Sequence, residues 1–197
     1  MSDCLIIFTR YPEPGKTKTR LIPALGAEQA AKLQQTFTES TLQKAQTLST
    51  SVQIEVHFAN GNTQKMQDWL GQNITVKPQF QGNLGQRMAA SFQQAFESGN
   101  QRVVIIGIDC PDLTPALLQK AFTLLQNQDL VLGKALDGGY YLIGLQHLIP
   151  ALFQNIAWGT DTVLQQTVEI ATKLQLQVAY LPTLRDIDTP EDLAYLN

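Results

Sequence analysis

Apolar runs typical of buried strands alternate with segments of helical periodicity along almost the whole chain. Two of these runs, Leu-Ile-Ile-Phe at 5–8 and Val-Val-Ile-Ile at 103–106, contain no polar residue. A strand without polar alternation is typical of a parallel sheet that is covered on both faces. Between the runs, apolar residues recur at helical spacing, as Leu84, Met88 and Phe92 do. This alternation predicts a three-layer αβα fold with a mostly parallel sheet.

The expected strands lie at 5–8, 52–58, 74–76, 103–106, 130–132, 140–145 and 178–181, and the expected helices at 27–48, 63–70, 84–98, 114–127, 160–174 and from 189 onward. Thr114-Pro115 and Thr189-Pro190 each combine a helix cap with a first-turn proline. The stretch 137–159 is less regular, and we expect it to depart from the alternation and to shape the site. A chain of 197 residues with no evident linker suits one domain, 1–197.

The composition excludes several classes of protein. The net charge is -3 and no basic stripe covers a whole face, which argues against a nucleic-acid partner. No apolar run approaches the roughly 18 residues of a membrane span, and no signal peptide is evident at the start. Cys4 and Cys110 form no CxxC pair, so neither a disulfide framework nor a zinc site is expected. The expected location is the cytoplasm.

A basic loop follows the first strand. The segment from Arg10 to Leu21, R-Y-P-E-P-G-K-T-K-T-R-L, contains two prolines and Gly15 and therefore does not form a helix. Such a loop lies at the edge where open α/β sheets bind their ligands. Lys16, Lys18 and Arg20 alternate, so all three can point the same way if the loop is extended. Convergent cations suit a polyphosphate. The alternative is a basic loop that faces only solvent.

Aspartates follow two other strands. Asp109 comes three residues after the end of the apolar run at 103–106, in a position to bind Mg²⁺ together with nucleotide phosphates. Asp112 is nearby, but a role in the loop or in helix capping is the stronger interpretation. Asp186 and Asp188 alternate in a second acidic segment, and either could complete the cation shell. The alternative for Asp188 is that it or Thr189 caps the last helix.

Two glycine-containing segments are further candidates for contact with a ligand. The run Asp137-Gly138-Gly139-Tyr140 permits close approach of the backbone to a ligand, although an ordinary tight turn explains it equally well. The run 81–85, Gln-Gly-Asn-Leu-Gly, suits base or ribose contacts, and a capped helix start is the alternative. His57 and His147 are interpreted as structural or surface residues, so a catalytic histidine is not expected.

Six ordered motifs resemble those of one family across nearly the whole chain. They are F-T-R-Y-P-E-P-G-K-T-K-T-R-L, Q-G-N-L-G-Q-R-M, G-I-D-C-P-D-L, D-G-G-Y-Y-L-I-G-L, W-G-T-D-T-V-L and D-I-D-T-P-E-D-L. Together they resemble the glycosyltransferase-like transferases labelled radical-SAM/selenodomain-associated, which belong to the nucleotide-diphospho-sugar transferase superfamily with the GT-A fold. The first, third and last motifs are also similar to those of phospholactate and molybdenum-cofactor guanylyltransferases, which are more distant relatives.

The resemblance implies roles for individual residues. It implies a catalytic phosphate-gripping group of Lys16, Lys18 and Arg20, with Asp109 as the magnesium ligand and Asp186 and Asp188 as the second acidic motif. With the residue patterns above, we expect nucleotide binding by the basic loop and the 81–85 segment, at Arg10, Gly15, Gln81, Gly82 and Gly85. Acceptor binding is expected at Asp137, Gly138, Gly139, Tyr140, Trp158 and Thr160. The chain departs from the family at Asn83, Lys134 and Gly159, where Asp, Pro and Ser are usual.

Three functions remain open at this point. The favoured one is Mg²⁺- or Mn²⁺-dependent nucleotidyl transfer from an NTP to a small anionic acceptor, with release of pyrophosphate. Three cations at one edge would stabilise the leaving pyrophosphate, and an anionic acceptor needs no general base. The second is glycosyl transfer from a nucleotide sugar, and the third is nucleotide binding without turnover. The partners expected are therefore a nucleotide and a small-molecule acceptor.

Overall fold

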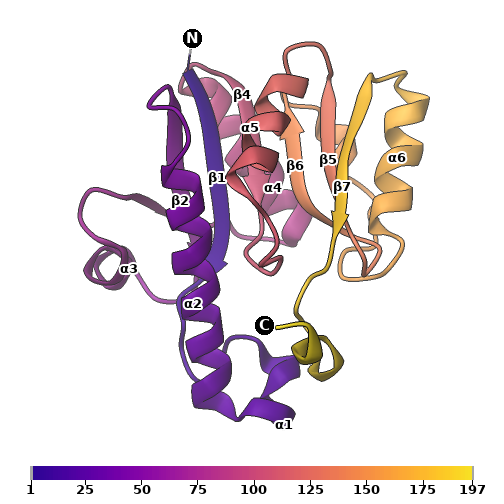
Figure 1. The fold of residues 1–197 in the computed structure, drawn as a ribbon. Coiled ribbons are helices and arrows are strands. Elements are labelled where there is room, and N and C mark those ends of the chain that lie inside the picture. Colours follow the sequence, from indigo (N-terminus) through magenta and orange to yellow (C-terminus); the bar gives the residue numbers. More distant parts are fainter. Residues whose placement is uncertain (1, 197) are drawn as a thin grey trace.

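The computed structural model describes residues 2–196, and these form a seven-stranded sheet with the order β3-β2-β1-β4-β6-β5-β7 (Figure 1). The strands are β1 Ser2–Arg10, β2 Val52–Ala59, β3 Thr75–Pro78, β4 Asn100–Ile106, β5 Leu130–Ala135, β6 Tyr140–Leu145 and β7 Val178–Leu184. Strand β6 runs antiparallel to its neighbours β4 and β5, and the other neighbouring pairs are parallel. The predicted mostly parallel sheet is confirmed.

The α-helices are α1 Ile22–Leu25, α2 Ala27–Gln46, α3 Thr63–Leu70, α4 Leu84–Glu97, α5 Pro115–Leu124 and α6 Val163–Lys173, and the 3-10 helices are η1 Thr19–Leu21, η2 Pro150–Phe153 and η3 Pro190–Tyr195. Local chemistry fixes several of their starts. The Asn62 side chain accepts from the backbone N–H of Lys65 at α3, and Thr114 caps α5 in the same way. None of the helices within residues 2–196 is both long and apolar enough to cross a membrane.

Helices cover both faces of the sheet, because the central strands are apolar on both sides. In β1, Leu5 and Ile7 join a core cluster with residues of α2 and α5, such as Phe122. Cys4 and Ile6 point to the opposite face and join a cluster with residues of α4, such as Phe92. The rings of Phe92 and Phe122 are almost completely buried, and burial of each contributes about 1.5–3 kcal/mol to folding. The result is the predicted three-layer αβα arrangement.

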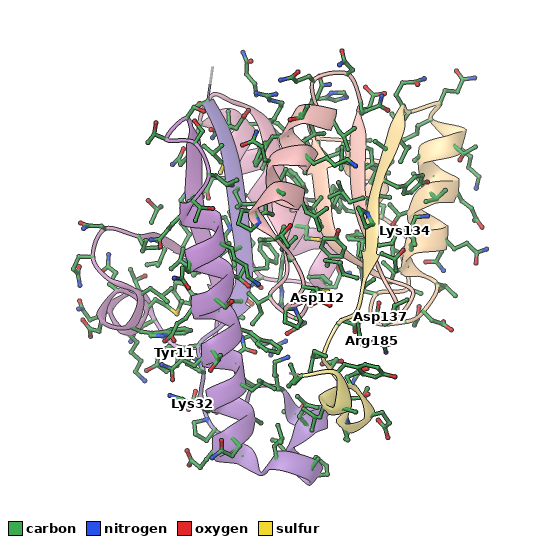
Figure 2. The ribbon with its side chains drawn as sticks, viewed as in Figure 1. Tyr11, Lys32, Asp112, Lys134, Asp137 and Arg185 are labelled. Atoms are coloured by element: carbon green, nitrogen blue, oxygen red, sulfur yellow. The ribbon has the colours of Figure 1, made fainter. Side chains whose placement is uncertain are left out.

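The antiparallel strand β6 determines what reaches the ligand-binding edge. The chain turns back between β5 and β6, so the turn at 136–139 lies at the edge where β1, β4 and β7 also end. In Figure 2, Asp112, Asp137 and Arg185 all lie toward this lower edge of the sheet. The irregular stretch 137–159 therefore does depart from the strand–helix alternation, as expected from the sequence.

The ends of the chain differ most from the expected elements. The basic loop was expected to contain no helix, but its last residues form the 3-10 helix η1, and the short helix α1, also not expected, follows directly. The last helix of the chain is a 3-10 helix. In Figure 1 these first and last helical segments lie together below the sheet. Hydrogen bonds link the basic loop to the chain that leads into η3, as described below.

Candidate functional site

A cleft of about 650 Å³ lies at the carboxyl edge of the sheet. It brings together residues that the sequence places far apart, from the basic loop, the ends of β4 and β7, the β5–β6 turn and the segment before α6. The predicted site residues that line it are Arg10, Lys16, Lys18, Arg20, Asp109, Asp137, Gly139, Tyr140, Trp158, Thr160, Asp186 and Asp188. The fold therefore brings these residues together in one cleft.

The expected base- or ribose-binding segment 81–85 is mainly a helix start. Asn83 accepts from the backbone N–H of Gln86, and the Gln86 side chain accepts from the N–H of Asn83, which forms a capping box. Gln81, Gly82 and Gly85 do not line the cleft. A Cβ on Gly85 would lie 2.6 Å from the Trp158 ring, so this glycine lets the aromatic ring pack against α4.

The basic loop is a series of turns, so its three cations do not point the same way as they would in an extended loop. The Lys16 side chain is 62% exposed and pairs with Glu13 at 2.9 Å. Gly15, at φ 81°, has open space around it and does not line the cleft. Lys18 adopts the left-handed conformation, with φ 44° and ψ 46°, and its side chain turns inward until only 3% of it is exposed. The alternation of the loop therefore predicts its geometry wrongly.

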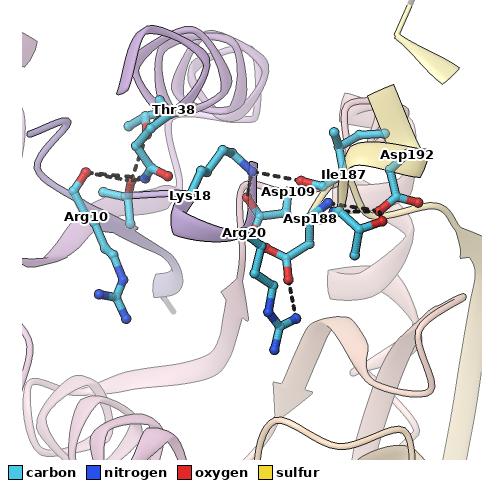
Figure 3. A network of polar contacts seen from close by, with 11 residues as sticks. Arg10, Lys18, Arg20, Thr38, Asp109, Ile187, Asp188 and Asp192 are labelled. Atoms are coloured by element: carbon cyan, nitrogen blue, oxygen red, sulfur yellow. Dashed lines mark hydrogen bonds and ion pairs between the residues drawn. The ribbon is translucent and has the colours of Figure 1, made fainter. Parts of the chain in front are cut away.

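Lys18 joins three segments of the site (Figure 3). Its ammonium donates to Oδ1 of Asp109 at 2.7 Å and to the backbone oxygen of Ile187 at 2.8 Å. The Asp109 side chain remains 46% exposed at the mouth of the cleft. Asp109 thus faces Lys18 on one side and the cleft on the other.

Arg20 and Asp188 form a second link between the same two segments. The guanidinium Nη1 lies 2.6 Å from Oδ2 of Asp188, in the open part of the site. The capping role at the last helix belongs to Thr189 and Asp192, because the Asp192 carboxylate accepts from both the backbone N–H and the hydroxyl of Thr189. Asp188 is consequently free of the capping role that the sequence left open, and its side chain lines the cleft.

Carboxylates gather on the side of the cleft where β7 and the β5–β6 turn end. Burial raises the pKa of the Asp186 carboxyl, and the negative charge of Asp137 raises it further. Within residues 2–196, no group of three or more Asp, Glu, His or Cys side chains is arranged as a finished metal site. The donors nevertheless fit a hard cation, because Mg²⁺ takes only one or two carboxylates and completes its shell with water and phosphate oxygens. Asp109 together with Asp186 or Asp188 can supply them.

The far wall of the cleft is aromatic and tightly built. Tyr140 and Trp158 pack edge to face with ring centroids 6.5 Å apart. Gly138, at φ 87°, lies against the next segment so closely that a Cβ would be 2.1 Å from the backbone oxygen of Asp161. Gly138 itself does not line the cleft, whereas Asp137 and Gly139 do. The Asp137-Gly138-Gly139 run is therefore a tight turn whose flanks face the site.

Sequence reasoning missed some of the lining residues. Leu84, Tyr141, Asp161 and Val163 also line the cleft. Asp161 had a signal, because it directly follows the flagged residues Trp158 and Thr160 in the motif W-G-T-D-T. Leu84 had only a helical signal, since it begins the apolar repeat of the predicted helix at 84–98, and it is 44% exposed.

The predicted structural role of His57 agrees with its surroundings. Its ring bonds to Ser91 and Glu55, each at 2.9 Å, and Lys77 donates to the same carboxylate at 2.8 Å. This order of groups is that of a hydrolytic triad, but His57 and Ser91 are 0% exposed and do not line the cleft. A buried serine without access for a substrate is a core hydrogen-bonding group. Asp112 and His147 are exposed and also lie outside the cleft.

Comparison with known proteins places the chain in a family. Residues 41–160 match the model of a family described as uncharacterized proteins conserved in bacteria (DUF2064). A crystal structure from Desulfovibrio desulfuricans G20, provisionally named a nucleotide-diphospho-sugar transferase, is 39% identical, with 96% of this chain and 84% of that chain covered and a TM-score of 0.91. The chain belongs to the DUF2064 family. Its fold is that of the nucleotide-diphospho-sugar transferases, which confirms the predicted superfamily and agrees with the prediction of a transferase.

More distant structures share the fold of this DUF2064 protein. One is 4-diphosphocytidyl-2C-methyl-D-erythritol synthase from Anaerococcus prevotii DSM 20548, with 13% identity, a TM-score of 0.64 and coverage of 98% of this chain and 93% of that chain. Another is Rv0371c from Mycobacterium tuberculosis H37Rv in complex with manganese, with 14% identity, a TM-score of 0.58 and coverage of 100% and 98%. Comparison with curated proteins finds none with significant sequence similarity to the chain.

Proposed function

We propose that this DUF2064 protein is a divalent-cation-dependent transferase that moves a nucleotidyl group from a nucleoside triphosphate to a small acceptor. The observation that carries the proposal is that cations from one side of a single cleft face carboxylates from the other. Arg10, Lys16 and Arg20 come from the β1 side, and the carboxylates of Asp109 and Asp186 lie at the ends of β4 and β7. A triphosphate bound between them would meet cations on one side and a carboxylate-held metal ion on the other.

The reaction is a displacement at the α-phosphorus. An acceptor oxygen forms the new P–O bond, the bond between the α-phosphorus and the α–β bridging oxygen breaks, and pyrophosphate leaves with the electron pair. Lys16 and Arg20 stabilise the negative charge that develops on the leaving group. Asp109, with Asp186 or Asp188, would hold Mg²⁺ or Mn²⁺, which supplies neutralisation of charge on the phosphate oxygens.

The aromatic wall of the cleft, at Tyr140 and Trp158, is where we expect the acceptor to bind. Its surroundings favour a different acceptor from the anionic one that the sequence favoured. Of the charged residues that line the cleft, Asp137 and Asp161 lie within three positions of Tyr140 and Trp158 in the sequence, whereas the cations belong to β1 and the loop that follows it. Like charges would repel an acceptor phosphate or carboxylate there. We therefore favour an uncharged hydroxyl acceptor with an apolar or ring-shaped part, whose proton a wall carboxylate accepts.

Glycosyl transfer from a nucleotide sugar is the second candidate, and the name given to the 39% identical relative favours it. The same wall suits this reaction, since a hydroxyl acceptor again needs a carboxylate to take its proton. The two reactions differ in the donor. Nucleotidyl transfer places three phosphates beside the basic loop, and glycosyl transfer places two phosphates there with a sugar at the acceptor wall.

A thermal-shift screen with NTPs and nucleotide sugars, each with and without Mg²⁺, separates these readings. Stabilisation follows RT ln(1 + [L]/Kd), so a ligand at 100 times its Kd stabilises the protein by about 2.7 kcal/mol. We expect Mg²⁺-dependent stabilisation that is larger with an NTP than with any nucleotide sugar. The reverse order would favour glycosyl transfer. No stabilisation by either class of donor would refute a nucleotide-dependent transferase, and binding without pyrophosphate release across an acceptor panel would favour a protein that binds nucleotides without turnover.

A further inference from the structure

We propose that Lys18 is a positioning residue: it fixes the orientation of Asp109 and ties together three loops of the cleft, and it does not bind phosphate. The proposal rests on the proposed function only in that a cation binds at Asp109. It reassigns the central cation of the basic loop, since Lys16 and Arg20 are left as the phosphate-facing groups.

Most of the hydrogen-bonding capacity of the Lys18 ammonium is already used within the protein. An ammonium has three N–H donors, and here it donates to Asp109 Oδ1 at 2.7 Å and to the Ile187 backbone oxygen at 2.8 Å. Its nitrogen also lies 4.8 Å from the centre of the Phe37 ring, within range of a cation–π contact. Only 3% of the side chain is exposed, against 62% for Lys16. A phosphate would have to compete with both hydrogen bonds for an ammonium on a side chain that is almost completely buried.

The same contacts control what Asp109 presents to the cleft. The backbone N–H of Ile187 donates to the backbone oxygen of Asp109 at 2.8 Å, so the two residues are joined directly and also through Lys18. Ile187 is 1% exposed and anchors this junction in the core. Because Oδ1 of Asp109 faces Lys18 while the side chain stays 46% exposed, the carboxylate is held with its other oxygen available to the cleft.

The backbone of Lys18 supports the same reading. Its left-handed conformation is unfavourable for a residue with a side chain. Residues held in such conformations persist where the surrounding structure over-determines them, and they cluster at functional sites. Here the conformation turns the side chain under the loop, toward Asp109 and Ile187, while Lys16 stays outside. A loop whose role was only to present cations to solvent would not need this turn.

Removal of the Lys18 side chain should change the affinity for a cation in opposite directions, depending on whether Lys18 orients Asp109 or only adds positive charge beside it. Removing a positive charge 2.7 Å from Asp109 should strengthen the binding of a cation if only charge matters. If Lys18 orients the carboxylate, its removal should weaken cation binding, because groups that orient metal ligands typically contribute 10–100-fold to metal affinity. Phosphate gripping gives a third pattern, in which cation binding is unaffected and phosphate binding is lost.

The test compares Lys18→Met with Lys16→Met, a matched substitution in the same loop. Calorimetry would measure the affinity for Mn²⁺ alone and, separately, for inorganic pyrophosphate in the presence of EDTA. Hydrogen exchange at the Ile187 amide would report the junction without any ligand. For Lys18→Met we expect Mn²⁺ affinity to fall tenfold or more, pyrophosphate affinity to stay within twofold of wild type, and exchange at Ile187 to become faster. For Lys16→Met we expect the loss in pyrophosphate affinity alone.

Three results would overturn the proposal: Mn²⁺ affinity in Lys18→Met that equals or exceeds that of wild type, a loss of pyrophosphate affinity as large as in Lys16→Met, or unchanged protection of the Ile187 amide. If the wild-type protein bound neither Mn²⁺ nor pyrophosphate, the proposed function would fail, and the exchange measurement would still decide whether Lys18 ties the loops. If Lys18→Met does not fold, Lys18→Gln, which keeps a hydrogen-bond donor, takes its place.

Discussion

In the ion pair between Lys18 and Asp109, substitution of the half-exposed Asp109 should lower the stability of the fold more than substitution of the buried Lys18. In Asp109→Asn the ammonium of Lys18 stays in a pocket where 3% of its side chain is exposed, and it loses its counter-charge. Breaking a fully buried pair costs about 3–5 kcal/mol. Water reaches the half-exposed Asp109 and reduces that figure, so we expect a loss of about 2–3 kcal/mol in the free energy of unfolding.

The reciprocal change should cost less. Lys18→Met leaves Asp109 at the open cleft, where water solvates it, and its main loss is the charged hydrogen bond to the Ile187 oxygen. That loss is about 1.5–2 kcal/mol, at the low end of the range for a hydrogen bond to a charged group. The double variant Lys18→Met/Asp109→Asn leaves no buried charge unpaired, so it should also lose only about 1.5–2 kcal/mol. The two effects should therefore be non-additive by about 2–3 kcal/mol, the loss expected for Asp109→Asn alone.

Urea unfolding at neutral pH measures all four proteins of this cycle. With a slope of about 2 kcal/mol per M, Asp109→Asn should lower the unfolding midpoint by about 1–1.5 M, and the double variant should recover part of that loss. Additive losses, or an Asp109→Asn variant as stable as wild type, would refute the reasoning, because the ammonium would then not depend on Asp109 in solution. The cycle also shows why Asp109→Asn alone is a poor probe of metal binding.

Other consequences of the site can be tested by single substitutions. Lys16→Ala and Arg20→Ala should each weaken the binding of an NTP about tenfold more than the binding of the nucleoside diphosphate, because a charge-assisted contact contributes about 1.5–3 kcal/mol. Calorimetry would measure both affinities. Small losses that are equal for the two ligands and vary only with salt would indicate a solvated surface loop. Asp188→Ala should weaken Mg²⁺–nucleotide binding with little loss of stability, whereas Thr189→Ala should lower the stability by about 1 kcal/mol through the lost cap and leave binding intact. Thermal melts would measure stability and calorimetry would measure binding. If Asp188 were the cap, Asp188→Ala would lose stability and keep its binding. Gly138→Ala should lower the melting temperature more than Gly15→Ala does. Both glycines have positive φ, but only at Gly138 would the added Cβ lie 2.1 Å from a backbone oxygen. Similar melting temperatures for the two variants would contradict this packing.

The fold could be predicted from the sequence because the central strands have a single plausible environment. The runs at 5–8 and 103–106 are apolar at every position, and only a sheet covered on both faces buries both sides of such strands. The Thr114-Pro115 signal places a helix start correctly, because cap and first-turn proline act locally. The antiparallel strand β6 has no comparable local signal. Its direction follows from the tight turn at Gly138, where sequence alone left two interpretations open.

The site was predicted in part. The carboxyl ends of β1, β4 and β7 meet at one edge in any fold of this class, so Lys16, Asp109 and Asp188 could be expected near one another. The burial of Lys18 could not be expected, because it depends on a left-handed residue and on a partner 169 positions away, the oxygen of Ile187. The same holds for Gly85, whose role is set by the distant ring of Trp158.

A crystal structure with Mn²⁺ and a non-hydrolysable NTP analogue tests the central claim most directly. We expect an anomalous manganese peak within coordination distance of Asp109 and of Asp186 or Asp188. The terminal phosphates should lie against Lys16 and Arg20, and the aromatic wall of Tyr140 and Trp158 should remain open for the acceptor. Manganese absent from these carboxylates, or a nucleotide bound outside the cleft, would contradict the account.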